Sequence, residues 1–158
     1  MHGRAHDEYL VTEVMTATPQ KLHLMLIDAA LRQCERARRL WSEGNEEGAS
    51  ASLAKSQEVV SELLASLNYA EHADLTRRIA GIYNFVFRSL VTAHIQHDEK
   101  SLADAVRLLE IERETWRQIV EKTASQPTPS HHESHASHAI PAPVRMVDMP
   151  TSSLSFEA

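Results

Sequence analysis

The stretch TPQKLHLMLIDAALRQCERARRLWSEGN, residues 18–45, decides the fold. Thr18 can cap the free backbone N–H groups of a helix start, and Pro19 suits the first helical position because it has no N–H to leave unpaired. Apolar residues then recur at steps of three and four and form one stripe: Leu26, Ala30, Cys34, Ala37 and Trp41. Gly44 and Asn45 end the pattern, since glycine favours a left-handed cap. We therefore predict a helix from Pro19 to about Glu43.

Three further helices follow from the same spacing, over about Glu46–Leu67, Ala73–His97 and Ser101–Thr123, the last capped by Asp98 or Ser101. The stripe of the second helix is Ala49, Leu53, Ser56, Val60, Leu63 and Leu67. The stripe of the third is Leu75, Ile79, Ile82, Val86 and Ala93. The stripe of the fourth is Leu102, Val106, Leu109, Arg113, Trp116 and Val120. Because the links are short, neighbouring helices should run antiparallel, and residues 18–123 are predicted to form an all-α, up-down four-helix bundle.

The two ends of the chain differ from this bundle. Residues 1–17 form a polar N-terminal arm with a few apolar anchors, among them Tyr9 and Val14, which are too sparse for more than a turn or two of helix. Residues 124–158 are rich in Pro, Ser and His and poor in aliphatic side chains. Such a segment cannot bury enough apolar surface to offset its ordering entropy, so we expect a disordered tail.

Composition restricts the partners and the compartment. The chain has 158 residues and a formal net charge of −6, which fits one soluble domain and argues against phosphate-rich nucleic-acid partners. Cys34 is the sole cysteine and can form no internal disulfide. No apolar run is long enough for a membrane span, and no secretory signal pattern opens the sequence. We expect a cytoplasmic protein that does not insert into membranes.

Histidines are the residues most able to carry chemistry, and their context is unfavourable. No His has Glu three residues before it, so the paired motif of di-iron bundles is missing. His94 could serve phosphotransfer, but no Lys-Gly pair follows it. The tail histidines could bind Zn²⁺ or Ni²⁺ loosely and are better explained as a solvated segment: His131, His132, His135 and His138. We therefore expect neither an enzyme nor a metal or cofactor site.

The third predicted helix carries more large apolar residues than one core-facing stripe needs. If Ile82 and Val86 face the core, the remaining apolar side chains point elsewhere: Tyr83, Phe85, Phe87 and Val91. A helix that is apolar nearly all round is either buried on every side or covered by a partner. Both explanations, extra core burial and a binding surface, stay open at this level.

The segment YLVTEVMTATPQKLHLMLID, residues 9–28, resembles the signature of the FliS family of flagellar chaperones. In that family a Tyr, a Val and Thr-Ala-Ser-Pro are followed by Leu, Met-Leu-Tyr-Asp and Gly-Ala at this spacing. This chain has Thr18 in place of Ser, Ile27 in place of Tyr and Ala29 in place of Gly. Shorter stretches at 55–57, 61–63, 66–68 and 113–116 are also similar, so the resemblance covers roughly residues 9–120.

The resemblance implies a cytoplasmic chaperone that binds the C-terminal segment of flagellin, prevents its premature polymerisation and helps deliver it to the type III export apparatus. In the family the N-terminal arm can occupy the binding groove when flagellin is absent, and Tyr9 and Val14 match that arm. Together with the apolar excess on the third helix, this leads us to expect Tyr83 and Phe87 in the flagellin groove. A bundle-type adaptor for another flagellar or secretion protein is the alternative, and a homodimer remains open.

Overall fold

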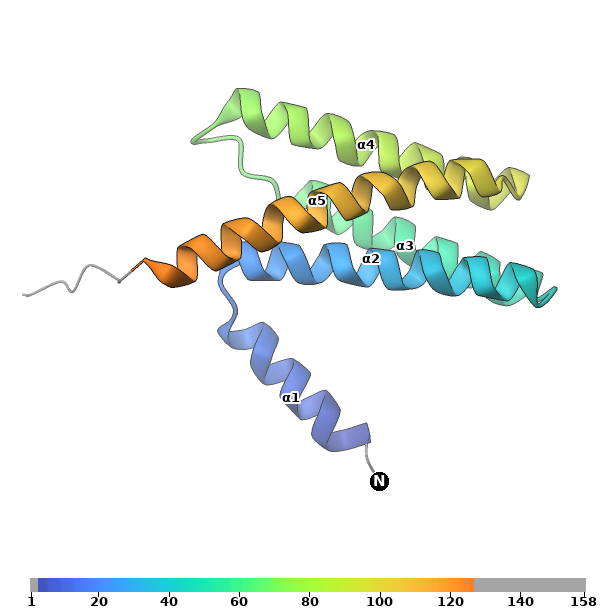
Figure 1. Cartoon of the computed structure of the whole chain (residues 1–158), viewed down its shortest axis with the longest axis horizontal. Helices are drawn as coiled ribbons and strands as arrows, with labels where there is room; N and C mark the ends of the chain where they lie inside the picture. The colour runs from blue at the N-terminus through green and yellow to red at the C-terminus, as the bar shows by residue number, and fades with distance from the viewer. Residues whose placement is uncertain (1–2, 127–158) are drawn as a thin grey trace, which may run out of the picture. The chain divides into compact units, whose positions relative to one another are not determined.

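The computed structural model describes residues 3–126, and this part of the chain is all-helical, with five helices and no strands (Figure 1). The expectation of an all-α protein is confirmed at this level. The five helices are α1 (Gly3–Thr16), α2 (Pro19–Ser42), α3 (Glu46–Ala65), α4 (Ala73–Gln96) and α5 (Glu99–Ser125).

The ends of α2 follow directly from the local sequence. Thr18 is the N-cap, and its hydroxyl accepts a hydrogen bond of 3.2 Å from the backbone N–H of Lys21. Gly44 adopts the left-handed conformation with φ 73°, which ends the helix as predicted. Asn45 then caps α3, because its side-chain oxygen accepts from the backbone N–H of Gly48 at 2.9 Å. The α2–α3 turn is therefore encoded in three adjacent residues.

A two-residue turn joins α4 to α5. His97 adopts the left-handed conformation with φ 51°, which is uncommon for a residue with a side chain. Asp98 caps α5, and its carboxylate accepts from the backbone N–H of Lys100 at 3.1 Å. The imidazole of His97 stacks on Trp41 of α2, with ring centroids 4.2 Å apart, and lies 3.0 Å from a carboxylate oxygen of Glu46. Contacts from two other helices therefore hold this turn in place.

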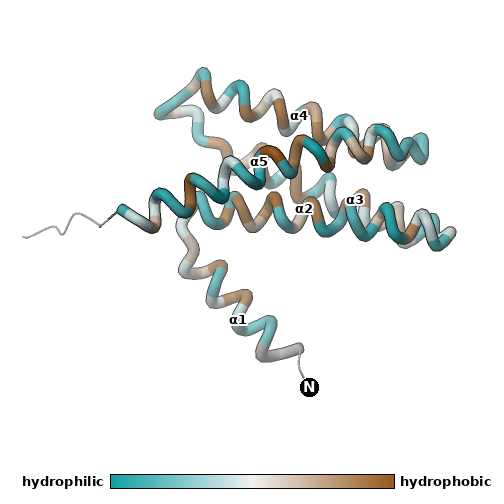
Figure 2. Tube along the Cα trace, viewed as in Figure 1, coloured by the Kyte–Doolittle hydropathy of each residue, from teal (hydrophilic) through white to brown (hydrophobic). Residues whose placement is uncertain are grey.

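Helices α2–α5 pack against one another, and we call them the helical core. The contacting pairs are α2 with α3, α3 with α4, α4 with α5 and α5 with α2. Hydrophobic and hydrophilic residues alternate along the helices in Figure 2, the pattern of helices that each bury one stripe. The largest fully buried side chains come from all four helices, including Ile27, Leu53, Tyr83 and Leu109.

Two predicted stripes need correction. Leu75 was placed on the core side of α4, but 57% of its surface is exposed, and the buried stripe is instead Thr76, Ala80, Tyr83, Val86, Leu90 and Ala93. Arg113 was placed on the core side of α5, but it is exposed and Glu112 is buried in its place. In both helices the true stripe includes polar residues, which a search for apolar side chains passes over.

The N-terminal arm contains more helix than expected. α1 has 14 residues, whereas the sequence predicted only a turn or two. Its apolar side chains do not supply the reason, because they are exposed. The hydroxyls of Thr12 and Thr16 donate to the carbonyls of Glu8 and Thr12 one turn earlier, at 2.9 Å each. Such bonds do not stabilise a helix, so they do not supply the reason either. One ion pair of 3.0 Å, Lys21 to Glu13, links α1 to α2.

The predicted tail begins later than its composition indicates. Ala124 and Ser125 continue α5, so the helix runs two residues beyond the predicted end at Thr123. The rest of the predicted tail, from residue 127 on, lies outside the described residues. Over residues 3–126, no helix combines the length and the apolar character of a membrane span.

Candidate functional site: an apolar cavity with a polar floor

A cavity of about 450 Å³ opens at the end of the helical core where α2 begins. Its residues come from the first two turns of α2, the segment between α3 and α4, the first turns of α4, and Trp116 of α5. Most of the wall is apolar and consists of Leu22, Leu26, Leu67, Leu75 and Ile79. The exposed position of Leu75 is explained by this cavity, because the side chain lies on its wall.

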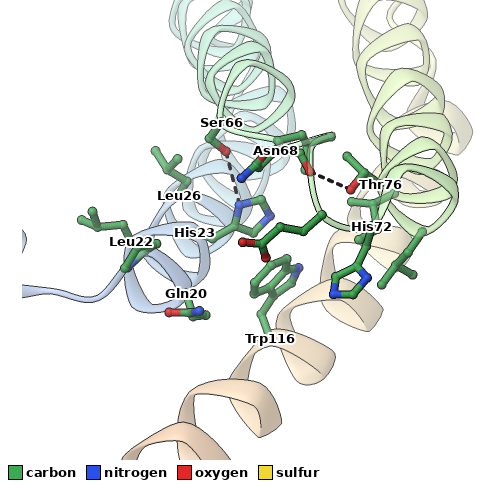
Figure 3. A pocket seen from close by; sticks show the side chains of 14 residues that line it. Gln20, Leu22, His23, Leu26, Ser66, Asn68, His72, Thr76 and Trp116 are labelled. Atoms are coloured by element: carbon green, nitrogen blue, oxygen red, sulfur yellow. Dashed lines mark hydrogen bonds between the residues drawn. The ribbon is translucent and has the colours of Figure 1, made fainter. Parts of the chain in front are cut away.

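Two rings from different helices meet at the cavity (Figure 3). The imidazole of His23, on α2, and the indole of Trp116, on α5, have centroids 4.0 Å apart with 35° between their planes. His23 is only 5% exposed, whereas Trp116 is half-buried. Aromatic contacts of this kind contribute roughly 0.5–1.5 kcal/mol beyond the area they bury. The pair therefore joins α2 to α5 beside the cavity.

Hydrogen bonds fix the orientation of His23. The hydroxyl of Tyr83 lies 2.6 Å from Nε2, and the hydroxyl of Ser66 lies 3.4 Å from Nδ1. Ser66 donates its own proton to the carbonyl of Leu63 at 2.9 Å. Both ring nitrogens therefore have a hydrogen-bonding partner. The imidazole joins α2, α4 and the end of α3 at one point.

Glu112 completes the buried polar cluster. Its side chain is 8% exposed, and one carboxylate oxygen lies 3.5 Å from the hydroxyl of Tyr83. Burial raises the pKa of Glu112, and burial with the nearby carboxylate raises the pKa of Tyr83. Burial lowers the pKa of His23 to about 4, so the imidazole is neutral at physiological pH. The polar cluster, His23, Tyr83 and Glu112, is a structural link below the cavity.

The rim of the cavity is held by local hydrogen bonds. The hydroxyl of Thr76, on α4, donates to the carbonyl of Asn68 at 2.9 Å, a bond that Figure 3 shows. The side-chain oxygen of Asn68 accepts from the backbone N–H of Ala70 at 2.9 Å. These bonds attach the segment between α3 and α4 to the first turn of α4. These bonds therefore fix one side of the cavity rim.

A second, smaller hollow of about 320 Å³ lies between α4 and α5. Phe85 of α4 is 45% exposed there, and Ile111 of α5 is 52% exposed. Leu108, Asp104 and Arg107 complete its lining. Large apolar side chains gathered on a surface in this way are typical of binding sites.

His94, the residue considered for phosphotransfer, has both ring nitrogens engaged. Nε2 lies 2.6 Å from the hydroxyl of Ser50, and Nδ1 lies 3.2 Å from the side-chain nitrogen of Gln57. The imidazole is partly buried between α3 and α4. These hydrogen bonds show that His94 links α4 to α3. Over residues 3–126 no group of His, Cys, Asp and Glu is arranged to hold a metal ion.

The four residues expected at the partner surface occupy three different environments. Tyr9 and Val14 lie on α1 and are 66% and 45% exposed. Phe87 is half-buried and packs against the edge of the core. Tyr83 is fully buried, so the interpretation that placed its side chain outside the core is wrong. The sequence spacing did contain the signal, because Tyr83 stands three residues after Ala80 and three before Val86.

The sequence interpretation names several residues of the cavity wall as core stripe residues but does not predict the cavity. His23 is covered only by the general exclusion of di-iron histidines, and Trp116 is predicted only as a core residue. Glu112 was not considered, although it follows the buried Leu109 by three residues and precedes Trp116 by four. That spacing places a carboxylate on the buried side of a helix. A buried acid needs partners from other helices, and sequence spacing cannot identify them.

Comparison with known proteins gives a consistent result. Residues 1–123 match the family model described as flagellar protein FliS. The flagellar secretion chaperone FliS of Bacillus subtilis (strain 168) is 29% identical over 116 residues, covering 73% of this chain and 86% of the relative. The protein of the same name from Salmonella typhimurium is 27% identical, covering 72% and 84%. That from Escherichia coli K12 is 26% identical, covering 66% and 78%.

The matched residues contain all five helices up to Thr123, the cavity and the polar cluster below it. The resemblance first noted on residues 9–28 therefore extends over the whole described core. The chain belongs to the FliS family of flagellar proteins.

Proposed function

We propose that this protein is a cytoplasmic export chaperone that binds the C-terminal segment of flagellin, prevents its premature polymerisation and aids its delivery to the flagellar type III export apparatus. The observation that carries the proposal is the family match over residues 1–123. Relatives from three bacteria, each covered over more than three quarters of its length, bear the name flagellar secretion chaperone. The coarse function, a flagellar export chaperone, rests on these relatives, and flagellin as the client is our finer assignment.

The scaffold that we propose for this task is an antiparallel, up-down four-helix bundle made of α2–α5. The four contacting helix pairs and the two-residue link from α4 to α5 support this arrangement, because short links favour antiparallel neighbours. Grooves between such helices suit an amphipathic helix, which lays its apolar face into them. The two hollows described above supply apolar surface of this kind.

Phe87 is our candidate anchor for the flagellin segment, and buried Tyr83 contributes indirectly, through its contact with His23. Phe87 is half-buried at the edge of the core and can still contact a partner. Tyr83 has no exposed surface, but its hydroxyl lies 2.6 Å from His23, which lines the cavity. Tyr83 therefore contributes to binding by holding His23 in position at the cavity. Tyr9 and Val14 are the arm residues that we propose cover apolar surface when flagellin is absent; they are 66% and 45% exposed in the structure and line neither hollow, so this role requires α1 to move onto the helical core.

Titration calorimetry with a synthetic flagellin C-terminal peptide tests this function. We expect saturable binding to the full chain. Phe87→Ala should weaken binding by about tenfold or more, because truncating an aromatic anchor in an interface typically costs over 1 kcal/mol. Circular dichroism and urea unfolding of the variant establish that it remains folded.

Phe85→Ala tests the alternative anchor, since Phe85 lies on the same helix in the hollow between α4 and α5. Ile95→Ala is the matched control, because Ile95 is an exposed apolar residue of α4 that lines neither hollow. Normal binding by a folded Phe87→Ala together with a loss in Phe85→Ala moves the anchor to that hollow. No binding of the peptide to the unaltered chain contradicts flagellin as the client and favours an adaptor for another flagellar or secretion protein.

A further inference from the structure

Among the described residues, the larger cavity is lined by one acidic side chain, that of Glu71, and by no lysine or arginine. No ion pair within 4.0 Å involves Glu71 over residues 6–126. The remaining polar lining consists of neutral groups and the imidazoles of His23 and His72, of which His23 is held neutral by burial. A cationic group would therefore meet a favourable field in this cavity.

The shape and chemistry of the wall add two further constraints. The leucines and Ile79 offer apolar contact on the wall of the cavity. The rings of His23, His72 and Trp116 face the same space in Figure 3. An indole is the best aromatic partner for a cation. The occupant that matches these features has an apolar stem and a flat cationic head.

We infer that the cavity receives an arginine side chain from the bound partner segment. Its methylene stem lies along the leucines, and its guanidinium stacks on Trp116 and pairs with Glu71. The inference rests on the proposed function, because it names the residue type that a client must place here. It makes the cavity a specificity site, whereas the apolar grooves accept any amphipathic helix.

Other occupants fit less well. A carboxylate would be repelled by Glu71 and would find no lysine or arginine on the described wall of the cavity. A purely apolar side chain would remove water from the Glu71 carboxylate and offer no partner in return. A lysine ammonium cannot stack as a flat group or pair with two oxygens at once. Of these side chains, only arginine can contact the apolar wall, stack on the indole and pair with the Glu71 carboxylate at the same time.

The test uses a short acetylated and amidated peptide of leucine and alanine with one arginine, and the same peptide with citrulline, which has the same shape but no charge. The full chain has two tryptophans, so an NMR titration can follow two indole N–H signals, one from the cavity and one from a site away from it. The signal of Trp116 should shift on binding, and that of Trp41, which stacks on His97 at another turn, should not.

We expect the arginine peptide to bind about fivefold or more tightly than the citrulline peptide, from one exposed ion pair and one cation–π contact. Glu71→Gln should reduce this preference, because it removes the ion pair and leaves the cation–π contact with Trp116. Glu110→Gln is the matched control, because it removes the same charge from an exposed site on α5 outside both cavities, and it should preserve the preference.

Equal binding of the two peptides to the unaltered chain overturns the inference and indicates an apolar occupant. A Trp116 signal that depends on protein concentration and ignores the peptides also overturns it, since a second copy of the chain then fills the cavity. These outcomes are separable from failure of the proposed function. A flagellin peptide that binds without any effect of Glu71→Gln contradicts only the arginine site, whereas a flagellin peptide that fails to bind while the arginine peptide shifts Trp116 contradicts only the client.

Discussion

His23 shows how one residue can connect a core to a surface. It is 5% exposed, hydrogen-bonded on both ring nitrogens and packed against the tilted ring of Trp116, yet it lines the cavity. A buried polar side chain costs free energy unless its partners are in place. Here Tyr83 and Ser66 supply them from α4 and from the end of α3. A change at His23 should therefore affect both the stability of the fold and the shape of the cavity.

Acidification should destabilise the protein through His23. Its pKa is about 4 in the fold and about 6.5 when unfolded, so between these values the unfolded chain binds the extra proton. Stability from the neutral imidazole is complete above about pH 6.5 and is lost as the pH falls towards 4. The free energy of unfolding, measured with urea, should fall by roughly 1–2 kcal/mol between about pH 7 and about pH 5, allowing for screening at the cavity mouth.

His23→Gln supplies the control for this pH dependence. Glutamine can still hydrogen-bond but does not titrate, so the variant should lose the slope in this window while remaining foldable. Glu112 acts with the opposite sign, because its raised pKa favours the protonated acid in the fold and its stabilisation is lost as the pH rises. A slope that persists unchanged in His23→Gln would assign the effect to other groups.

Leu63 and Leu109 test the packing of the core. Both are fully buried, on α3 and α5. Truncation of either to alanine should lower the free energy of unfolding by about 2–5 kcal/mol, through lost burial and the cavity left behind. Leu75→Ala is the matched control, since this leucine is mostly exposed, and it should change stability by less than about 1 kcal/mol. Urea unfolding measures all three variants, and a neutral Leu63→Ala or Leu109→Ala contradicts the burial.

At the scale of elements, α1 differs from the other four helices. It has 14 residues, and its apolar side chains are exposed: Tyr9, Leu10, Val11, Val14 and Met15. A free helix of this length is marginal in water. Exposed apolar residues on a marginal helix are available to cover another surface. This is the physical basis for our proposal that α1 can cover a binding groove when flagellin is absent.

Deletion of residues 1–14 should leave the helical core folded and should keep or raise the affinity for the flagellin peptide. The deletion removes a competitor inside the same molecule, whose effective concentration is high. The core loses little, because one ion pair, Glu13 to Lys21, is the described polar link between α1 and α2. Calorimetry with the peptide measures the effect. If binding disappears, α1 belongs to the binding site and is not its cover.

At the scale of the whole molecule, the C-terminal segment should be dispensable for folding. Its sequence is rich in Pro, Ser and His and contains few aliphatic side chains. Removal of residues 127–158 should change the free energy of unfolding by less than about 1 kcal/mol and leave the flagellin peptide affinity unaltered. Thermal and urea unfolding of the shortened chain provide the measurement. A larger loss of stability would show that this segment packs on the rest of the protein.

The sequence by itself determined the helices of the core. Thr18, Gly44, Asn45 and Asp98 act within a few residues of themselves, as caps and as a left-handed turn, so local sequence was sufficient to locate the helix ends. The predicted starts of α2, α3 and α4 agree with the structure, and that of α5 differs by two residues. The family resemblance was equally local, because residues 9–28 carried it.

Only the tertiary structure decided which polar residues lie inside and where the cavity opens. Tyr83 is buried with its hydroxyl within reach of His23 and of Glu112, and these partners are 60 and 29 residues away along the chain. The cavity likewise needs Leu22, Leu75 and Trp116 to converge from three helices. Spacing within one helix fixes which side chains share a face. It does not fix what that face meets, since that depends on how the helices pack.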